Sequence, residues 1–325
     1  EKLKPKPHQK RAIQDVLAHF KDHNRGQLIM ACGTGKTFTT LWIKEGLSAK
    51  RTLVLVPSLN LLSQSMREWA RASKTSIKTL AVCSDKSVGR EDEDISSQEV
   101  PFPVTSEVAD ISNFLKSNEE GVVFCTYHSS ELIAKAQLKN ETPTFDLAIA
   151  DEAHRCAGNA SADFAIILDE KRIRSSKRLF TTATPRYFAE NSKRSARSRG
   201  NDLVSMNDED AFGPEFHKLT FGKAISKRLL NDYRVVVFGV NQDSIKELIE
   251  ERGLVALDKK IADAETLAAQ LGLLKAIRDY DLERVISFHS RKSRAKEFSN
   301  QLDNHLALIK KSQCPPRKFF SLLVS

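Results

Sequence analysis

Two short segments, well separated in the sequence, carry the residue types that phosphate and magnesium chemistry needs. The segment Met30–Thr37 reads MACGTGKT and follows an apolar run, and the segment Asp151–His154 reads DEAH and follows another. The first has the pattern of a phosphate-binding loop, in which backbone N–H groups and a helix N-terminus face the phosphates. The second supplies two carboxylates at the end of a strand. Together they predict an ATP-hydrolysing site.

The loop contains the residues that close contact with phosphate requires. Glycines let the backbone approach a ligand without a Cβ clash, and a lysine adds a point charge for the β- and γ-phosphates. A threonine hydroxyl after that lysine is the expected Mg²⁺ ligand. Met30 stands where the strict pattern has its first glycine, so a glycine-rich turn between strand and helix is the alternative. The predicted nucleotide-binding residues of the loop are Gly33, Thr34, Gly35, Lys36 and Thr37.

Asp151 and Glu152 follow the apolar run at 145–150, which places them at the carboxyl end of a buried strand. Ligands of open α/β sheets bind at that end. We expect Asp151 to hold Mg²⁺ and Glu152 to orient or deprotonate the attacking water, with Lys36 as the third catalytic residue. Either acid alone could instead be a surface residue that caps a helix.

Strand-like and helix-like segments alternate along the chain, which predicts a parallel sheet covered by helices. Short apolar runs predict strands at 27–31, 52–56, 78–82, 122–126, 147–150 and 178–182, the last of them ending the sheet. Apolar residues at helical spacing predict helices at 10–20, 37–47 and 59–72. The acidic stretch 89–103 is expected to be a loop, and the polar stretch 189–210 a loop or an insertion. The basic residues Lys193, Arg194, Arg197 and Arg199 within the latter could track a DNA backbone, but a solvated loop is the expectation.

A second domain is predicted to follow a connecting helix at 221–230. It should contain strands at 234–240 and 284–288 and helices at 267–277 and 293–302. Residues 310–325 fit no element because Cys314-Pro315-Pro316 interrupts any helix. The expected domains are therefore 1–232, a partial second domain at 233–309 and an irregular tail at 310–325.

Composition excludes several classes of protein. No apolar run approaches the roughly 20 residues of a membrane helix, and the N-terminus lacks a signal-peptide stretch. The five cysteines show no C-x-x-C spacing, which argues against a zinc site or a disulfide framework and favours a reduced, cytoplasmic setting. The net charge of +9 favours a polyanionic partner, although any basic soluble protein would share it.

The motif Asp151–His154, with Gly33–Thr37 before it and Thr182-Ala183-Thr184-Pro185 after it, resembles the superfamily 2 DEAD/DEAH-box helicases and translocases. The segments DEAHRCAG at 151–158, FGP at 212–214 and LNDYR at 230–234 look like the restriction-enzyme-type subgroup. This resemblance implies a RecA-like α/β fold with a partial second RecA-like domain. It also implies ATP and Mg²⁺ as cofactors, and ATP-driven movement on, or opening of, double-stranded DNA. Nuclease or methyltransferase domains would belong to other parts of such a protein.

The resemblance assigns further roles by position. Gln9 matches the glutamine that reads the adenine edge, although it could equally be a polar residue that opens a helix. His154, Thr182 and Thr184 match residues that couple the nucleotide state to strand binding. Ordinary helix caps or strand-end polar groups would explain the residues matched to nucleic-acid contacts equally well. Those matched residues are Pro57, Ser58, Thr126, Tyr127, Ser290 and Arg291.

One family motif is not matched. Members carry paired arginines late in the second domain, one of which acts on the γ-phosphate. After Leu302, the Lys and Arg residues of this chain are only Lys310, Lys311, Arg317 and Lys318. We therefore expect an incomplete fragment that binds ATP and Mg²⁺ but hydrolyses ATP weakly by itself. A non-catalytic, ATP-gated nucleic-acid-binding module and an RNA helicase are the alternatives.

Overall fold

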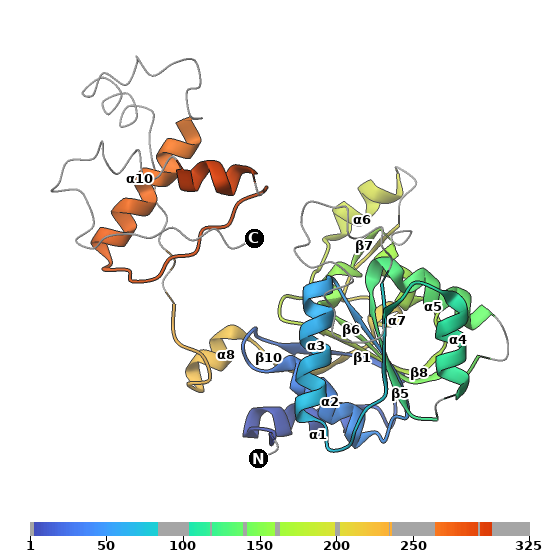
Figure 1. Cartoon of the computed structure of the whole chain (residues 1–325). Helices are drawn as coiled ribbons and strands as arrows, with labels where there is room; N and C mark the ends of the chain where they lie inside the picture. Colours follow the sequence, from blue (N-terminus) through green and yellow to red (C-terminus); the bar gives the residue numbers. More distant parts are fainter. Residues whose placement is uncertain are drawn as a thin grey trace, which may run out of the picture. The chain divides into compact units, whose positions relative to one another are not determined.

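In the computed structural model, the chain forms two compact units, Glu1–Asp232 and Tyr233–Ser325 (Figure 1). The structure describes residues 3–83, 104–117, 119–138, 142–159, 163–198, 202–233, 235, 264–291 and 293–300. The first unit ends at the residue where the sequence analysis ends its first domain. The expected loop at 89–103, the tail at 310–325 and, apart from Val235, the expected strand at 234–240 lie outside the described residues.

The first unit is built on one eight-stranded sheet in the order β10-β1-β8-β6-β2-β5-β3-β4. Every neighbouring pair in it is parallel, which agrees with the predicted fold class. The strands are β1 (Arg25–Met30), β2 (Arg51–Val56), β3 (Thr79–Val82), β4 (Val104–Thr105), β5 (Gly121–Thr126), β6 (Phe145–Asp151), β8 (Ser175–Thr182) and β10 (Glu215–Leu219). A separate antiparallel pair joins β7 (Gly158–Asn159) to β9 (Leu203–Val204).

Helices cover both faces of the sheet (Figure 1). The helices of the first unit are α1 (Pro7–His19), α2 (Lys36–Gly46), α3 (Leu59–Ala72), α4 (Val108–Ser117), α5 (Ser130–Leu138), α6 (Glu190–Arg197), α7 (Glu209–Phe212) and α8 (Phe221–Ser226). Three short 3₁₀ turns are η3 (Tyr127–Ser129), η4 (Ala153–Arg155) and η5 (Asp163–Leu168). Their positions follow from the alternation of strands and helices, because a parallel sheet needs a crossover between successive strands.

The alternation of side chains along each strand divides the interior into two cores. In β2, Val54 and Val56 pack in the core that also contains residues of α1, α2 and α3. Leu53 and Leu55 point to the opposite face and pack with residues of α4 and α5. All four side chains are buried, which explains why the strand is apolar throughout rather than alternating. The sheet is thus covered on both faces, and its strand ends are left to carry the functional residues.

Three predictions about the first unit were wrong. The strand at 178–182 is not the last in the sheet, because β10 adds an edge beside β1. Only Phe216 and Leu219 of β10 are buried, so its apolar signal in the sequence is weak. The polar stretch 189–210 is not simply a loop, since it contains α6 and β9. The connecting helix ends at Ser226 rather than Leu230, and Arg228 adopts a positive φ of 54°.

The regular secondary structure in the described part of the second unit is helical. Helix α10 (Ala264–Asp279) covers the helix predicted at 267–277, and residues 293–300 are helical as predicted. The strand predicted at 284–288 was wrong, because these residues have no regular secondary structure. Ile286 and Phe288 are 79 % and 91 % exposed, and none of the described residues forms a ladder with this segment. A strand needs a hydrogen-bonding neighbour, and apolar residues alone do not provide one.

Candidate active site

Three neighbouring strands bring the predicted residues together. Strands β1, β8 and β6 lie side by side and parallel, so their carboxyl ends meet at one edge of the sheet. The phosphate loop follows β1, Thr182 ends β8, and Asp151 ends β6. Residues far apart in the sequence therefore converge at the edge where ligands of parallel sheets bind.

The loop between β1 and α2 has the conformation that its glycines permit. Gly33 and Gly35 have φ angles of 77° and 82°, in the left-handed region that a side chain disfavours. Gly35 directly precedes α2, so the first N–H groups of that helix open toward the loop. The Thr34 hydroxyl donates to the Ala31 carbonyl at 2.6 Å and closes the turn from inside. The indole N–H of Trp69 in α3 donates to the Thr37 carbonyl at 3.0 Å and holds the start of α2.

Lys36 and Glu152 form an ion pair across this edge. The Lys36 ammonium lies 3.8 Å from Glu152 Oε1, and the two side chains are 10 % and 25 % exposed. Glu152 has a positive φ of 50°, which is uncommon for a residue with a side chain. That backbone turn lets the chain leave β6 and enter η4 at once. The ammonium group predicted to bind phosphate and the carboxylate predicted to activate water thus lie next to each other.

The Asp151 carboxylate is held by neighbours on both sides. Its Oδ1 atom accepts a hydrogen bond from the Thr181 hydroxyl at 2.6 Å and another from the Glu152 backbone N–H at 3.0 Å. The Tyr127 hydroxyl donates to the Asp151 backbone carbonyl at 2.7 Å. Among the described residues, no three His, Cys, Asp or Glu side chains gather around a common point. A Mg²⁺ ion suits such a site, because it keeps several waters and takes few protein ligands when phosphates are present.

His154 connects the acidic motif to the end of β8. Its Nδ1 atom lies 3.3 Å from Glu152 Oε2 and 3.0 Å from Thr182 Oγ1. Since a carboxylate only accepts, the proton of the neutral ring is assigned to Nδ1. Thr182 Oγ1 also accepts the Thr184 backbone N–H at 3.1 Å. Burial lowers the pKa of His154, and the Glu152 carboxylate opposes that effect. His154 and Thr184, two of the predicted coupling residues, thus both contact the hydroxyl of the third, Thr182.

A cavity of about 410 Å³ lies beside the loop, on the side of α1. The stacked rings of Phe38 and Trp42, 6.1 Å apart, line it together with Gln9. The Gln9 amide accepts from the Lys6 N–H at 2.8 Å and donates to the Thr34 and Gly35 carbonyls, both at 3.3 Å. Gln9 therefore supports the phosphate loop directly, and its reading of adenine stays a prediction.

The residues predicted to contact nucleic acid differ in their accessibility. Ser58 is partly exposed and caps α3, with its hydroxyl accepting from the Leu61 N–H at 3.4 Å, whereas Pro57 is buried. Thr126 and Tyr127 are 1 % and 0 % exposed, and their hydroxyls bond to Ser129 and Asp151. Those two side chains give no support to the prediction.

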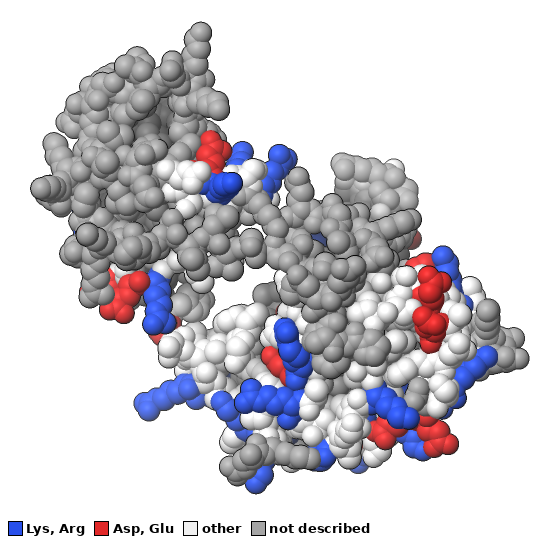
Figure 2. Space-filling view, in the orientation of Figure 1, with Lys and Arg blue, Asp and Glu red and all other residues white. Residues whose placement is uncertain are grey.

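In the second unit, Ser290 and Arg291 are exposed, as a phosphate contact requires. On the face of the molecule in Figure 2, Lys and Arg side chains are spread among Asp and Glu. The net charge by itself therefore does not locate a nucleic-acid surface.

Sequence reasoning missed Thr181, Tyr127 and His8 as supporting residues of the site. His8 Nε2 donates to the Thr34 carbonyl at 3.0 Å, beside Gln9. Thr181 sits next to the recognised Thr182, but only the pairing of β8 with β6 places it against Asp151. Tyr127 was noted for a different role. The contacts of Thr181 and Tyr127 depend on strand order, and that of His8 depends on how α1 packs beside the loop. The sequence pattern contains neither.

Comparison with known proteins identifies the family. Residues 2–187 match the family described as "Type III restriction enzyme, res subunit". The chain belongs to this family. Its curated relatives include the probable helicase A859L of African swine fever virus, isolate Tick/Malawi/Lil 20-1/1983, which is 25 % identical over 261 residues. That match covers 77 % of this chain and 27 % of the viral protein. This res-subunit chain thus spans about a quarter of the length of the relative.

Two solved structures resemble this member of the res-subunit family along most of its length. The ATP-dependent Type ISP restriction-modification enzyme LlaBIII bound to DNA is 31 % identical, with a TM-score of 0.77. The match covers 95 % of this chain and 22 % of LlaBIII. A nuclease-deletion mutant of the Type ISP enzyme LlaGI, in complex with a DNA substrate mimic, is also 31 % identical, with a TM-score of 0.66 and coverages of 93 % and 21 %. The predicted RecA-like fold and the predicted restriction-type helicase resemblance are confirmed.

In the described part of the chain, no helix has both the length and the apolar character needed to cross a membrane.

Proposed function

We propose that this chain is the ATP-binding motor part of an ATP-dependent DNA helicase or translocase. The observation that carries the proposal is the continuous set of contacts from Lys36 through Glu152 and His154 to Thr182. It joins the phosphate loop, the acidic motif Asp151–His154 and the threonine motif Thr182–Thr184 in one site. A phosphate-binding turn without motor function would not need the last two links.

Each group has a definite part in hydrolysis. Lys36 and the N–H groups of the loop bind the β- and γ-phosphates. Thr37 and Asp151 would hold Mg²⁺, with Thr181 keeping the Asp151 carboxylate in place. Glu152 orients or deprotonates the attacking water. The adenine base of ATP would lie in the cavity beside Gln9, whose side chain also supports the phosphate loop.

Coupling of the nucleotide state to the nucleic acid runs through the end of strand β8. A change at the γ-phosphate moves Glu152, and His154 carries that movement to Thr182 and the backbone of Thr184. Because Thr184 is exposed, it can report the nucleotide state at the surface of the unit.

We infer that the partner is double-stranded DNA. LlaBIII and LlaGI, which are 31 % identical to this chain, were both solved with DNA or a DNA mimic. Ser58 at the start of α3 and the exposed Ser290 and Arg291 are the proposed backbone contacts. A nuclease or methyltransferase would be supplied by other domains or subunits. Because the sequence does not match the paired-arginine motif, we expect slow turnover by these 325 residues alone.

Steady-state ATP hydrolysis tests the proposal. The chain is assayed alone, with duplex DNA and with single-stranded RNA, beside Lys36→Ala and Glu152→Gln. We expect turnover that duplex DNA raises and that both variants lack, while Glu152→Gln retains ATP binding. Stronger stimulation by RNA would favour an RNA helicase. Nucleotide binding that is insensitive to Lys36→Ala would overturn the assignment of the site.

A further inference from the structure

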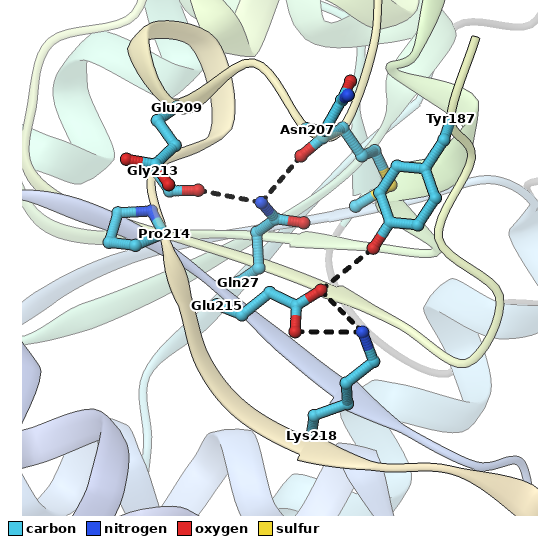
Figure 3. Close-up of a pocket in the computed structure, with 9 residues that line it drawn as sticks. Gln27, Tyr187, Asn207, Glu209, Gly213, Pro214, Glu215 and Lys218 are labelled. Carbon is cyan, nitrogen blue, oxygen red and sulfur yellow. Dashed lines mark hydrogen bonds and ion pairs between the residues drawn. The ribbon is translucent and has the colours of Figure 1, made fainter. Parts of the chain in front are cut away.

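A second cavity, of about 540 Å³, lies beside strand β10 at the edge of the sheet (Figure 3). It is formed by β1, β10 and the segments that lead into β10 from β8. It shares no lining residue with the cavity next to the phosphate loop. Its volume is in the range of ordinary ligand sites, and no step of ATP hydrolysis uses it.

Gln27 forms the floor of this cavity with one polar atom unused. The side chain is 2 % exposed, and its Nε2 atom donates to the carbonyls of Met206 and Gly213, both at 2.8 Å. Two carbonyl partners at the nitrogen fix the orientation of the amide. Its Oε1 atom is buried, has no partner in the described part of the chain, and points into the cavity (Figure 3). An unpaired buried acceptor of this kind is unfavourable, so an occupant with an N–H or O–H donor would be favoured there.

Glu215 and Tyr187 stand at the mouth of the cavity (Figure 3). Glu215 Oε1 accepts from the Tyr187 hydroxyl at 3.0 Å and from the Lys218 ammonium at 2.8 Å, and Oε2 accepts from Lys218 at 3.0 Å. A carboxylate has about four acceptor positions, so Oε2 has room for another donor. Tyr187 is 47 % exposed and leaves part of its ring open to contact.

The charge around the cavity is opposite to that of the chain. A neighbouring cavity of about 510 Å³ shares Glu209, Gly213 and Pro214 with it. The carboxylates lining the two cavities are those of Glu170, Glu209, Asp210 and Glu215, and the cations are those of Arg25 and Lys218. This local excess of acid, in a chain of net charge +9, attracts cations and repels phosphates.

We propose that the cavity binds an arginine side chain presented by a partner protein. A guanidinium has several N–H donors in one plane and no acceptor, which matches an acceptor at the floor and a carboxylate at the mouth. One N–H would bond to Gln27 Oε1 and others to Glu215, with the plane against the ring of Tyr187. A lysine ammonium is a compact point charge and cannot span both positions. The carboxylates argue against a nucleic-acid occupant.

Methyl NMR on the whole chain tests this proposal. The chain has three methionines, of which Met206 lines the cavity while Met30 and Met66 are buried in the core beside α1, α2 and α3. With methyl-labelled methionine, we expect acetyl-glycyl-arginyl-glycine amide to shift the Met206 signal alone. Half-saturation should lie on the order of 1 mM, as suits a single side chain. The matching lysine and citrulline peptides should bind at least about fivefold more weakly, because one lacks the planar fork and the other the charge.

Variants separate the site from general effects on the fold. Glu215→Gln keeps the shape of an exposed side chain and should weaken the arginine peptide at least about fivefold. Glu107→Gln, the matched control, neutralises an exposed glutamate that lines neither cavity and should leave binding intact, and both variants should bind Mg·ATP like the wild type. An unsaturable Met206 shift, equal binding of the citrulline peptide, or an unchanged affinity in Glu215→Gln would each overturn the proposal. Equal shifts at Met30 and Met66 would also overturn it, since they would indicate a non-specific effect.

Discussion

His154 and Thr182 are joined by a contact of 3.0 Å between Nδ1 and Oγ1, across the ends of two neighbouring strands. The same ring atom faces Glu152 Oε2 at 3.3 Å, and the same hydroxyl accepts the N–H of Thr184 at 3.1 Å. The acidic motif and the threonine motif are therefore one hydrogen-bonded unit. This unit connects the group that would activate water to the exposed turn after β8.

Thr182→Val removes the hydroxyl and keeps the shape of the side chain. We expect the DNA-stimulated part of ATP hydrolysis to fall about tenfold or more, while Mg·ATP affinity changes by less than about twofold, because the lost contact couples the site rather than binds the nucleotide. Thr182→Ser, the matched control, should behave like the wild type. Equal loss in both variants, or a parallel loss of ATP affinity in Thr182→Val, would show that Thr182 does not act as a coupling residue.

Burial of His154 predicts a pH dependence of stability. Burial lowers the pKa of the folded imidazole below its ordinary value of 6.5. The unfolded chain therefore takes up this proton first as pH falls, and the contribution present above pH 6.5 is lost below it. Urea midpoints measured from pH 7.5 to 5.5 should fall more steeply for the wild type than for His154→Gln. Parallel curves would contradict the pKa shift.

Gly35→Ala places a side chain where the backbone is left-handed. The φ of 82° disfavours any Cβ, and that atom would also lie 2.4 Å from Gln9 Nε2. A left-handed residue costs about 1–2 kcal/mol, so we expect Mg·ATP affinity to fall on the order of tenfold. Gly222→Ala is the control, because its Cβ would meet no atom within 4 Å, and Gly222 lies within helix α8. Calorimetry that gave equal affinities for the two variants would argue against the proposed loop conformation.

The parts of the fold that sequence reasoning found are those with a strong local signal. Strand β6 and helix α3 carry continuous or periodic apolar residues, and α3 was predicted with its observed bounds, Leu59–Ala72. The edge strand β10 was missed because only two of its side chains are buried. The segment 284–288 is as apolar as a strand should be, but it has no ladder partner among the described residues and forms no strand. Pairing between strands decides such cases, and it is not a local property.

The site shows the same division. The loop glycines and Asp151 could be found from their spacing, because a strand followed by a helix places them at one end of the sheet. The bond from Thr181 to Asp151 could not be, because it depends on β8 lying directly beside β6. Likewise, the position of Tyr127 directly after a strand suggested an accessible side chain. In the structure Tyr127 is buried, and its hydroxyl bonds to the Asp151 carbonyl.

Cys32 gives a direct reporter of the phosphate loop. It is exposed, whereas Cys83, Cys125 and Cys156 are buried. In a background with Cys314→Ser, we expect one thiol to react quickly with iodoacetamide, and Mg·ATP to slow that reaction at least about fivefold by covering the loop. Peptide mapping identifies the thiol. An alkylation rate that saturating nucleotide leaves unchanged would place the nucleotide elsewhere.

The most direct test of the account is the equilibrium affinity for Mg·ATP, measured by calorimetry on the wild type, Lys36→Ala and Lys74→Ala. Lys74 is a suitable control because its side chain is 76 % exposed and lies outside the loop. We expect saturable binding by the wild type and Lys74→Ala, and binding at least about tenfold weaker in Lys36→Ala, because a charge-assisted contact to phosphate is lost. Equal affinities in all three proteins would contradict the assignment of this edge of the sheet as the ATP site.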